Sequence, residues 1–223
     1  MALNQTIYNL KDFYRKLTIP QFTIVTGLVI IFFGTIILST PFCSSQRVGL
    51  WEAFFTATSA ITVTGLTIID IGEDLTILGQ VFLALMLLTG GLGLMAITTF
   101  LQGFVVKGTK LRTRLDKGKT LDEFGVGGIG RTFRSIAITA VSIISIGSFI
   151  LYFFGFIDIK NHAERLWASI FHSISAYNNA GFSLWSSSIY DYRSSLVVNF
   201  VFIFLIVLGG LGLSLIHISE PTR

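Results

Sequence analysis

Leu50–Leu66 reads LWEAFFTATSAITVTGL, and Leu166–Phe182 reads LWASIFHSISAYNNAGF. The two stretches lie 116 positions apart, and Leu-Trp, Phe, Ser-Ala and Gly recur in register in both of them. Amphipathic helices too short to cross a bilayer are predicted over Val48–Ala60 and Glu164–Tyr177, and each leads into a loop that contains a glycine. Each also lies between long apolar segments. The pattern predicts a duplicated unit in which the chain enters the membrane and turns back.

The composition places the chain among integral membrane proteins. It has 223 residues, of which 52% are hydrophobic and only 13% are charged. A soluble domain has about a quarter of its residues charged. Four runs are long and apolar enough to cross the hydrocarbon layer of about 30 Å as helices. They are Gln21–Leu38, Leu75–Val106, Ser135–Ile157 and Leu196–Ile216. The predicted fold class is an all-α polytopic membrane protein.

The placement of charge predicts the topology in the membrane. Basic residues precede the first apolar run and fill the connection between the second and third, whereas the stretch between the first two runs is mainly acidic. By the positive-inside rule, the N-terminus and the central linker are expected in the cytoplasm and both glycine loops outside. The cations of the linker are not interleaved with a stacking pattern of aromatic residues, so we expect no nucleic-acid partner.

These features divide the chain into five parts. We assign residues 1–19 to a cytoplasmic N-terminus, 20–106 to a first helix–pore loop–helix repeat, 107–130 to a basic cytoplasmic linker, 131–212 to a second such repeat, and 213–223 to a tail. The returning helix of each repeat contains GGLG, at 90–93 and 209–212. Small residues of this kind allow membrane helices to approach closely, so we expect a packing role for them.

The chemistry is predicted to reside in the backbone of the two loops. Irregular backbone at membrane depth is tolerated only where it is buried in protein or lines a water-filled cavity. There its carbonyl oxygens can replace the hydration shell of a cation, and the negative C-terminal ends of the two short helices favour positive charge. The candidate ion-binding residues are Thr62, Val63, Thr64, Gly65, Asn178, Asn179, Ala180 and Gly181.

At these loops, TVTGL and NNAGF, the chain resembles the Trk/Ktr/HKT superfamily of potassium transporters, in particular a bacterial Ktr- or Trk-type membrane subunit. The resemblance extends from Pro20 to Gly212. In that family four helix–pore loop–helix repeats each contribute one characteristic glycine to a selectivity filter, which Gly65 and Gly181 match.

The resemblance implies potassium uptake through a pore in the plasma membrane, with K+ as the transported ion. It also implies a homodimer of membrane subunits. Nucleotide is expected only on a cytoplasmic regulatory subunit of the RCK/KTN type, and no cofactor is expected in this chain itself.

The chain departs from the family pattern in having two repeats where four are expected. Its last residues, LSLIHISEPTR (Leu213–Arg223), abandon the apolar pattern and resemble the translation of a sequencing adapter. We therefore expect a truncated N-terminal half with a non-native tail. Half a ring cannot enclose an ion, so a non-conducting fragment with only an assembly role is the alternative function. A genomic read that continues in frame past Gly212 with the same eleven residues would remove the expectation about the tail.

Two other function classes are less well supported. His172 and Ser175 suggest an intramembrane serine hydrolase, but Thr56 replaces the histidine in the first copy, and no enzyme is expected. A tetrameric two-helix potassium channel would need a TVGYG-like filter and a single unit in each chain. The GxGxxG pattern at Gly125–Gly130 has no βαβ context and is assigned to the linker.

Two polar features are left with structural or open interpretations. Asn199 lies in the last apolar run and is expected to make an interhelical hydrogen bond. Asp70, Glu73 and Asp74 lie in the outer loop of the first repeat. They either concentrate cations at an outer mouth or are ordinary exposed loop residues.

Overall fold

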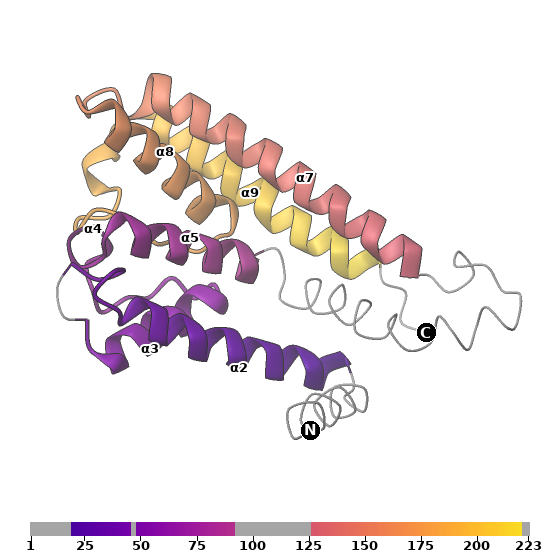
Figure 1. Cartoon of the computed structure of the whole chain (residues 1–223). Coiled ribbons are helices and arrows are strands. Elements are labelled where there is room, and N and C mark those ends of the chain that lie inside the picture. Colours follow the sequence, from indigo (N-terminus) through magenta and orange to yellow (C-terminus); the bar gives the residue numbers. More distant parts are fainter. Residues whose placement is uncertain (1–18, 46–47, 92–125, 220–223) are drawn as a thin grey trace, which may run out of the picture. The chain divides into compact units, whose positions relative to one another are not determined.

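The computed structural model describes residues 19–45, 48–91 and 126–219 (Figure 1). Over these residues the chain is helical, and strand-like pairing is limited to an isolated bridge between Ser44 and Leu75. The chain divides into two compact units, one of residues 1–29 with 94–135 and one of residues 30–93 with 136–223. The first unit contributes only the beginnings of two helices to the described residues. The second unit contains both glycine loops and the short helices that lead into them.

The first repeat contains α2 (Ile19–Leu38), α3 (Leu50–Ile61), α4 (Ile71–Asp74) and α5 (Ile77–Gly91). The helix α3 begins at Leu50, two residues later than the pattern predicts, because the backbone N–H of Gly49 donates to the Glu52 carboxylate over 2.7 Å. The short helix α4 has no counterpart among the predicted elements. It forms because the Asp70 side chain accepts hydrogen bonds from the first free N–H groups of that turn.

The second repeat contains α7 (Val126–Ile150), the π-helical turn η2 (Leu151–Gly155), α8 (His162–Tyr177), η3 (Tyr190–Tyr192) and α9 (Leu196–Ser219). The helix α8 begins two residues before the predicted start at Glu164. Its N-cap is Asn161, whose side-chain oxygen accepts from the N–H of Ala163 over 3.0 Å.

Several predicted segments lie outside the described residues, wholly or in part. They are the N-terminus (1–19, apart from Ile19), the end of the second apolar run (92–106), the linker (107–130, apart from 126–130) and the last four residues of the tail (220–223). Of the GxGxxG pattern only Gly125 lies outside, and the other five residues, which were assigned to the linker, form the start of α7.

Helices of the two repeats pack directly on one another. In the second unit α3 packs on α5, α5 on α8, and α8 on α9, and η2 contacts both α8 and α9. The Trp167 indole N–H of α8 donates to the Gln80 side-chain oxygen of α5 over 2.7 Å. The amide nitrogen of Gln80, which is buried, donates in turn to the carbonyls of Ile71 and Leu75, each over 3.2 Å. The contact between α5 and α8 therefore joins the two copies of the repeat through satisfied polar groups.

The described helices include membrane-length segments. Gln21–Leu38 and Arg134–Gly155 are long and apolar enough to cross a bilayer, and Ile77–Gly91 and Leu196–Leu211 are apolar but shorter within the described residues. These four segments coincide with the four predicted runs. Bulky apolar side chains on α7 and α9 are more than half exposed, among them Val141, Phe149, Phe200 and Phe204. In water such an exposed apolar surface would promote aggregation, whereas lipid solvates it.

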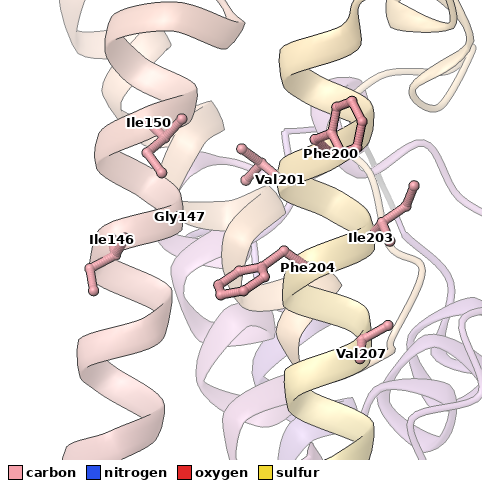
Figure 2. A pocket seen from close by; sticks show the side chains of 8 residues that line it. All are labelled: Ile146, Gly147, Ile150, Phe200, Val201, Ile203, Phe204 and Val207. Atoms are coloured by element: carbon pink, nitrogen blue, oxygen red, sulfur yellow. The ribbon is translucent and has the colours of Figure 1, made fainter.

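An apolar groove of about 450 Å³ runs between α7 and α9 (Figure 2). Its lining consists of Ile146, Gly147, Ile150, Phe200, Val201, Ile203, Phe204 and Val207. At its floor, a Cβ added to Gly147 would lie 2.9 Å from both methyl carbons of Leu205, so the glycine permits the close approach of the two helices there. The lining supplies no charged or polar side chain, so the groove offers no side-chain ligand to an ion.

The expectation for Asn199 was wrong. Its side-chain amide donates to the carbonyls of Arg193 over 3.0 Å and Ser195 over 2.8 Å, at the start of its own helix α9, instead of to another helix. Nearby, the Tyr192 hydroxyl donates to Asp158 over 2.8 Å. Burial, and to a smaller extent this contact with Asp158, raises the pKa of Tyr192. The hydroxyl therefore stays protonated and remains a hydrogen-bond donor.

Candidate functional site

The first loop, residues 62–65, and the second loop, residues 178–181, follow the ends of α3 and α8. Their backbones take the same path. Val63 and Asn179 have φ angles of 54° and 56°, and Gly65 and Gly181 have φ angles of 80° and 73°. Left-handed torsions therefore alternate with ordinary ones at equivalent positions of the two copies. This conformation favours glycine, which explains why a glycine ends each loop.

The backbone hydrogen bonds of the loops also recur at a spacing of 116 residues. The N–H of Thr64 donates to the carbonyl of Ser59 over 2.9 Å, and the N–H of Ala180 donates to that of Ser175 over 2.8 Å. Each bond bends the chain back onto the last turn of the preceding helix. The shape of each loop is therefore set by its own short helix.

In each copy, a serine hydroxyl of the short helix makes a hydrogen bond to the backbone of the residue that follows the loop glycine. The Ser59 hydroxyl oxygen accepts from the N–H of Leu66 over 2.9 Å, whereas the Ser175 hydroxyl donates to the carbonyl of Phe182 over 2.7 Å. The sequence pattern identified both serines as part of the duplicated unit but gave them no role in the loops. The signal that could have revealed this role is their fixed position six residues before each glycine.

The two loops meet at their glycines, although these lie 116 residues apart in the chain. A Cβ added to Gly65 would overlap the carbonyl oxygen of Ala180. A Cβ added to Gly181 would lie 3.9 Å from the Cα of Gly65, which is ordinary contact. The structure thus brings the two predicted sets of candidate residues together, and position 65 has no room for a side chain.

Within the described residues, the backbone carbonyls of both loops accept no hydrogen bond: none ends on a carbonyl oxygen of residues 62–65 or 178–181. Both loops also follow helix C-termini, where the helix dipole places partial negative charge. The arrangement offers oxygen ligands in a field that favours a cation, and no carboxylate of the described residues belongs to either loop.

Three of the loop side chains hold one another or neighbouring helices. The hydroxyls of Thr62 and Thr64 lie 2.6 Å apart. Asn179 donates to the carbonyl of Ile206 in α9 over 3.3 Å. These side-chain contacts hold the loops in place. The backbone carbonyl oxygens, which take no part in them, are the atoms best placed to bind a cation.

Asn178 packs across the boundary between the two repeats. It is fully buried, and its amide nitrogen donates to the carbonyl of Ile174 over 2.8 Å. Its side-chain oxygen has no hydrogen-bond partner among the described residues and lies against Gly91 of α5, where an added Cβ would overlap it. A larger residue at position 91 would therefore displace the first residue of the second loop.

The glycines of the returning helices lie against the ends of the short helices. A Cβ added to Gly90 would overlap the carbonyl oxygen of Ile61, and one added to Gly209 would overlap that of Tyr177. Ile61 and Tyr177 are the last residues of α3 and α8. The packing role predicted for GGLG thus falls on its first glycine in both copies, and in the first copy also on Gly91, which lies against Asn178. Gly93 lies outside the described residues.

The arrangement needed for a serine hydrolase is not formed. The Ser175 hydroxyl donates to the carbonyl of Phe182, and His172 lies instead against Ser183, with 3.1 Å between the ring Nε2 and the hydroxyl oxygen. The other ring nitrogen, Nδ1, lies 2.8 Å from the carbonyl of Ala168 and meets no carboxylate among the described residues. Ser175 is therefore not paired with His172, and no acidic side chain of the described residues orients the ring as a triad requires.

Val63 has a strained backbone, because a β-branched residue rarely adopts a positive φ angle. Asn179 has the same conformation in the second copy, and asparagine tolerates it well. We expect Val63→Asn to raise the free energy of unfolding by roughly 1 kcal/mol. Thermal unfolding of the purified chain in detergent measures the change. The reciprocal variant Asn179→Val should be less stable than wild type, and a destabilised Val63→Asn protein would contradict the assignment of strain.

Comparisons with known proteins identify relatives of the chain. The TrkH family model, described as "Cation transport protein", matches residues 11–219. The Ktr system potassium uptake protein B of Bacillus subtilis is 32% identical over 201 residues, which are 90% of this chain and 45% of that protein. The protein of the same name from Vibrio alginolyticus is 30% identical over 88% of this chain and 43% of its own length.

A third relative has a broader name. The potassium/sodium uptake protein NtpJ of Enterococcus hirae is 32% identical over 91% of this chain and 46% of its own length. The chain thus spans less than half the length of the curated relatives it matches.

Proposed function

The chain belongs to the TrkH family of cation transport proteins, and from this premise we propose that it is part of the membrane-embedded, potassium-translocating subunit of a Trk/Ktr-type uptake system. Members of this family are membrane transporters, not enzymes. The names of its relatives, which refer to potassium uptake, support K+ as the transported ion.

We propose that the ion is selected by the backbone carbonyls of Thr62–Gly65 and Asn178–Gly181. The observation that carries the proposal is the meeting of two loops with matching torsions, whose carbonyls have no donor among the described residues. A dehydrated cation needs several oxygen ligands at once to replace its water. Each helix–pore loop–helix repeat contributes one loop to such a ring of ligands.

Two loops supply only half of a four-fold ring, so the remaining ligands must come from outside the described residues. The relatives are more than twice as long as the part that this chain matches. Further repeats of the same polypeptide, or another copy of the chain, would complete the ring. An isolated non-conducting fragment that acts only in assembly is the alternative function.

The proposed orientation places the N-terminus and the central basic linker in the cytoplasm, in keeping with the positive-inside rule. The glycine loops then open to the outside. The expected partners are a second membrane subunit in a homodimer and a cytoplasmic, nucleotide-binding regulatory subunit of the RCK/KTN type. The "Ktr system" in the names of two relatives supports a system of several subunits.

The test is potassium-limited growth. Expressed from its complete gene in a bacterial strain that lacks potassium uptake, the protein is expected to restore growth at low K+ and to take up Rb+ in preference to Na+. Because the name of one relative includes sodium, Na+ uptake must be measured in the same cells. Flux into liposomes that contain the purified 223-residue chain separates the alternatives: no flux from the chain, with growth restored by the complete gene, identifies the chain as a non-conducting part.

A further inference from the structure

His172 lies in α8 and is completely buried. Its ring stacks on that of Trp185, with 4.2 Å between the ring centroids and 20° between their planes. The ring Nε2 lies 3.1 Å from the Ser183 hydroxyl oxygen and 3.4 Å from the backbone nitrogen of Leu184. The histidine therefore contacts three consecutive residues that follow the second loop.

The hydrogen bonds determine which ring nitrogen carries the proton. A backbone N–H can only donate, so Nε2 must be the acceptor for Leu184. The hydrogen is then on Nδ1, which donates to the carbonyl of Ala168 over 2.8 Å. The Ser183 hydroxyl donates to Nε2, while its oxygen accepts from the N–H of Trp185 over 3.1 Å. Every polar atom of this buried group thus has a partner.

The same bonds fix the path of the chain around Gly181. Before the glycine, the N–H of Ala180 donates to the carbonyl of Ser175. After it, the carbonyl of Phe182 accepts from the Ser175 hydroxyl, and the N–H of Leu184 donates to His172. Alternate residues 180, 182 and 184 are therefore anchored to α8. The carbonyls of Ala180 and Gly181 lie between the first two anchors, and the His172 acceptor holds the chain two residues after the second anchor.

The first repeat shows that helix packing does not require this histidine. The equivalent residue in α3 is Thr56, which is also fully buried, but its hydroxyl oxygen has no hydrogen-bond partner in the part of the chain that the structure describes. The anchor at this position is therefore specific to the second copy. This difference supplies a matched control within one chain.

We propose that His172 is a positioning residue that sets the ion selectivity of the second loop by anchoring the chain just after Gly181. The inference rests on the proposed function, since it concerns the same carbonyls. The part of the histidine that matters is the acceptor at Nε2, not a charge or a proton transfer. A side chain with an acceptor in the same place should replace it.

The experiment compares His172→Leu, His172→Gln and Thr56→Val in the protein expressed from its complete gene, with Rb+ and Na+ uptake measured in the strain that lacks potassium uptake. Gln brings an amide oxygen near the position of Nε2, whereas Leu leaves the N–H of Leu184 without an acceptor. We expect Leu to lower the Rb+/Na+ uptake ratio by about tenfold, Gln to keep it within about twofold, and Thr56→Val to leave it unchanged. The amount of each variant in the membrane is measured in parallel.

Ser183→Ala provides a second test, because this half-buried residue contributes one donor to His172 and its removal leaves the core intact. It is expected to lower the uptake ratio severalfold, and it decides the matter if His172→Leu fails to reach the membrane. An unchanged ratio in whichever of these two variants reaches the membrane overturns the proposal, and so does a Gln variant as defective as Leu. A wild-type protein that takes up neither ion overturns the proposed function instead, which is a separate outcome.

Discussion

Replacing Gly65 with alanine is expected to abolish selective potassium uptake. The φ angle of 80° alone makes any other residue costly, and the added Cβ would also overlap the carbonyl oxygen of Ala180 in the second loop. That oxygen belongs to a backbone anchored to α8 through Ser175, so it cannot move aside without displacing the second loop. One methyl group would therefore disturb the carbonyls of both loops at once.

The measurement is growth at limiting K+ together with Rb+ and Na+ uptake. A loss of at least a hundredfold in Rb+ uptake corresponds to roughly 3 kcal/mol, which is within reach of one disallowed torsion combined with one overlap of backbone atoms. Two further glycines calibrate the effect. Gly181→Ala should be less severe, because it shares the positive φ angle but its added Cβ would make only an ordinary contact, 3.9 Å from the Cα of Gly65.

Gly49→Ala should have little effect. Its φ angle of −65° is ordinary, and the nearest atom to an added Cβ is a Glu52 oxygen at 3.4 Å. If Gly65→Ala transports potassium as well as Gly49→Ala does, the two loops do not form a common ion site.

The helices and loops were largely predictable, because their signals are local. The linear sequence itself contains apolar runs of membrane length, a proline at the start of α2 and a repeated glycine. The features that could not be predicted are also local, but each depends on a single side chain. Side-chain caps such as those of Asp70 and Asn161 shift a boundary by two residues or form a single helical turn, and hydropathy does not register them.

The neighbours of the loops could not be predicted, because they come from distant parts of the chain. The contact between Gly65 and Ala180 joins the two repeats, and so does the bond between Gln80 and Trp167. The internal sequence repeat shows which positions of the two copies are equivalent, but not which positions are in contact. His172 illustrates the same limit, since its partners follow the second loop and its equivalent, Thr56, has no such partner.

A large effect is also expected from Gly209→Ala, this time on stability. Gly209 lies in α9 against the carbonyl oxygen of Tyr177, the last residue of α8, and an added Cβ would overlap that oxygen. Within a helix, alanine is otherwise favoured over glycine by about 1 kcal/mol. The overlap outweighs this gain, since relief would require α8 and α9 to separate near the second loop. We expect a net loss of about 3 kcal/mol in the free energy of unfolding.

The adjacent glycine is the control for this prediction. A Cβ on Gly210 would have only the Asn179 amide nitrogen nearby, at 3.9 Å, so Gly210→Ala should be as stable as wild type or slightly more stable. Thermal unfolding of the purified variants in detergent gives the comparison. Gly90→Ala should repeat the loss in the first copy, because Gly90 lies against the carbonyl of Ile61 in the same way. Equal stability of the 209 and 210 variants would mean that the returning helix does not support the end of α8. Parallel losses at 90 and 209 would mean that each loop rests on the same helix-to-helix contact in both copies.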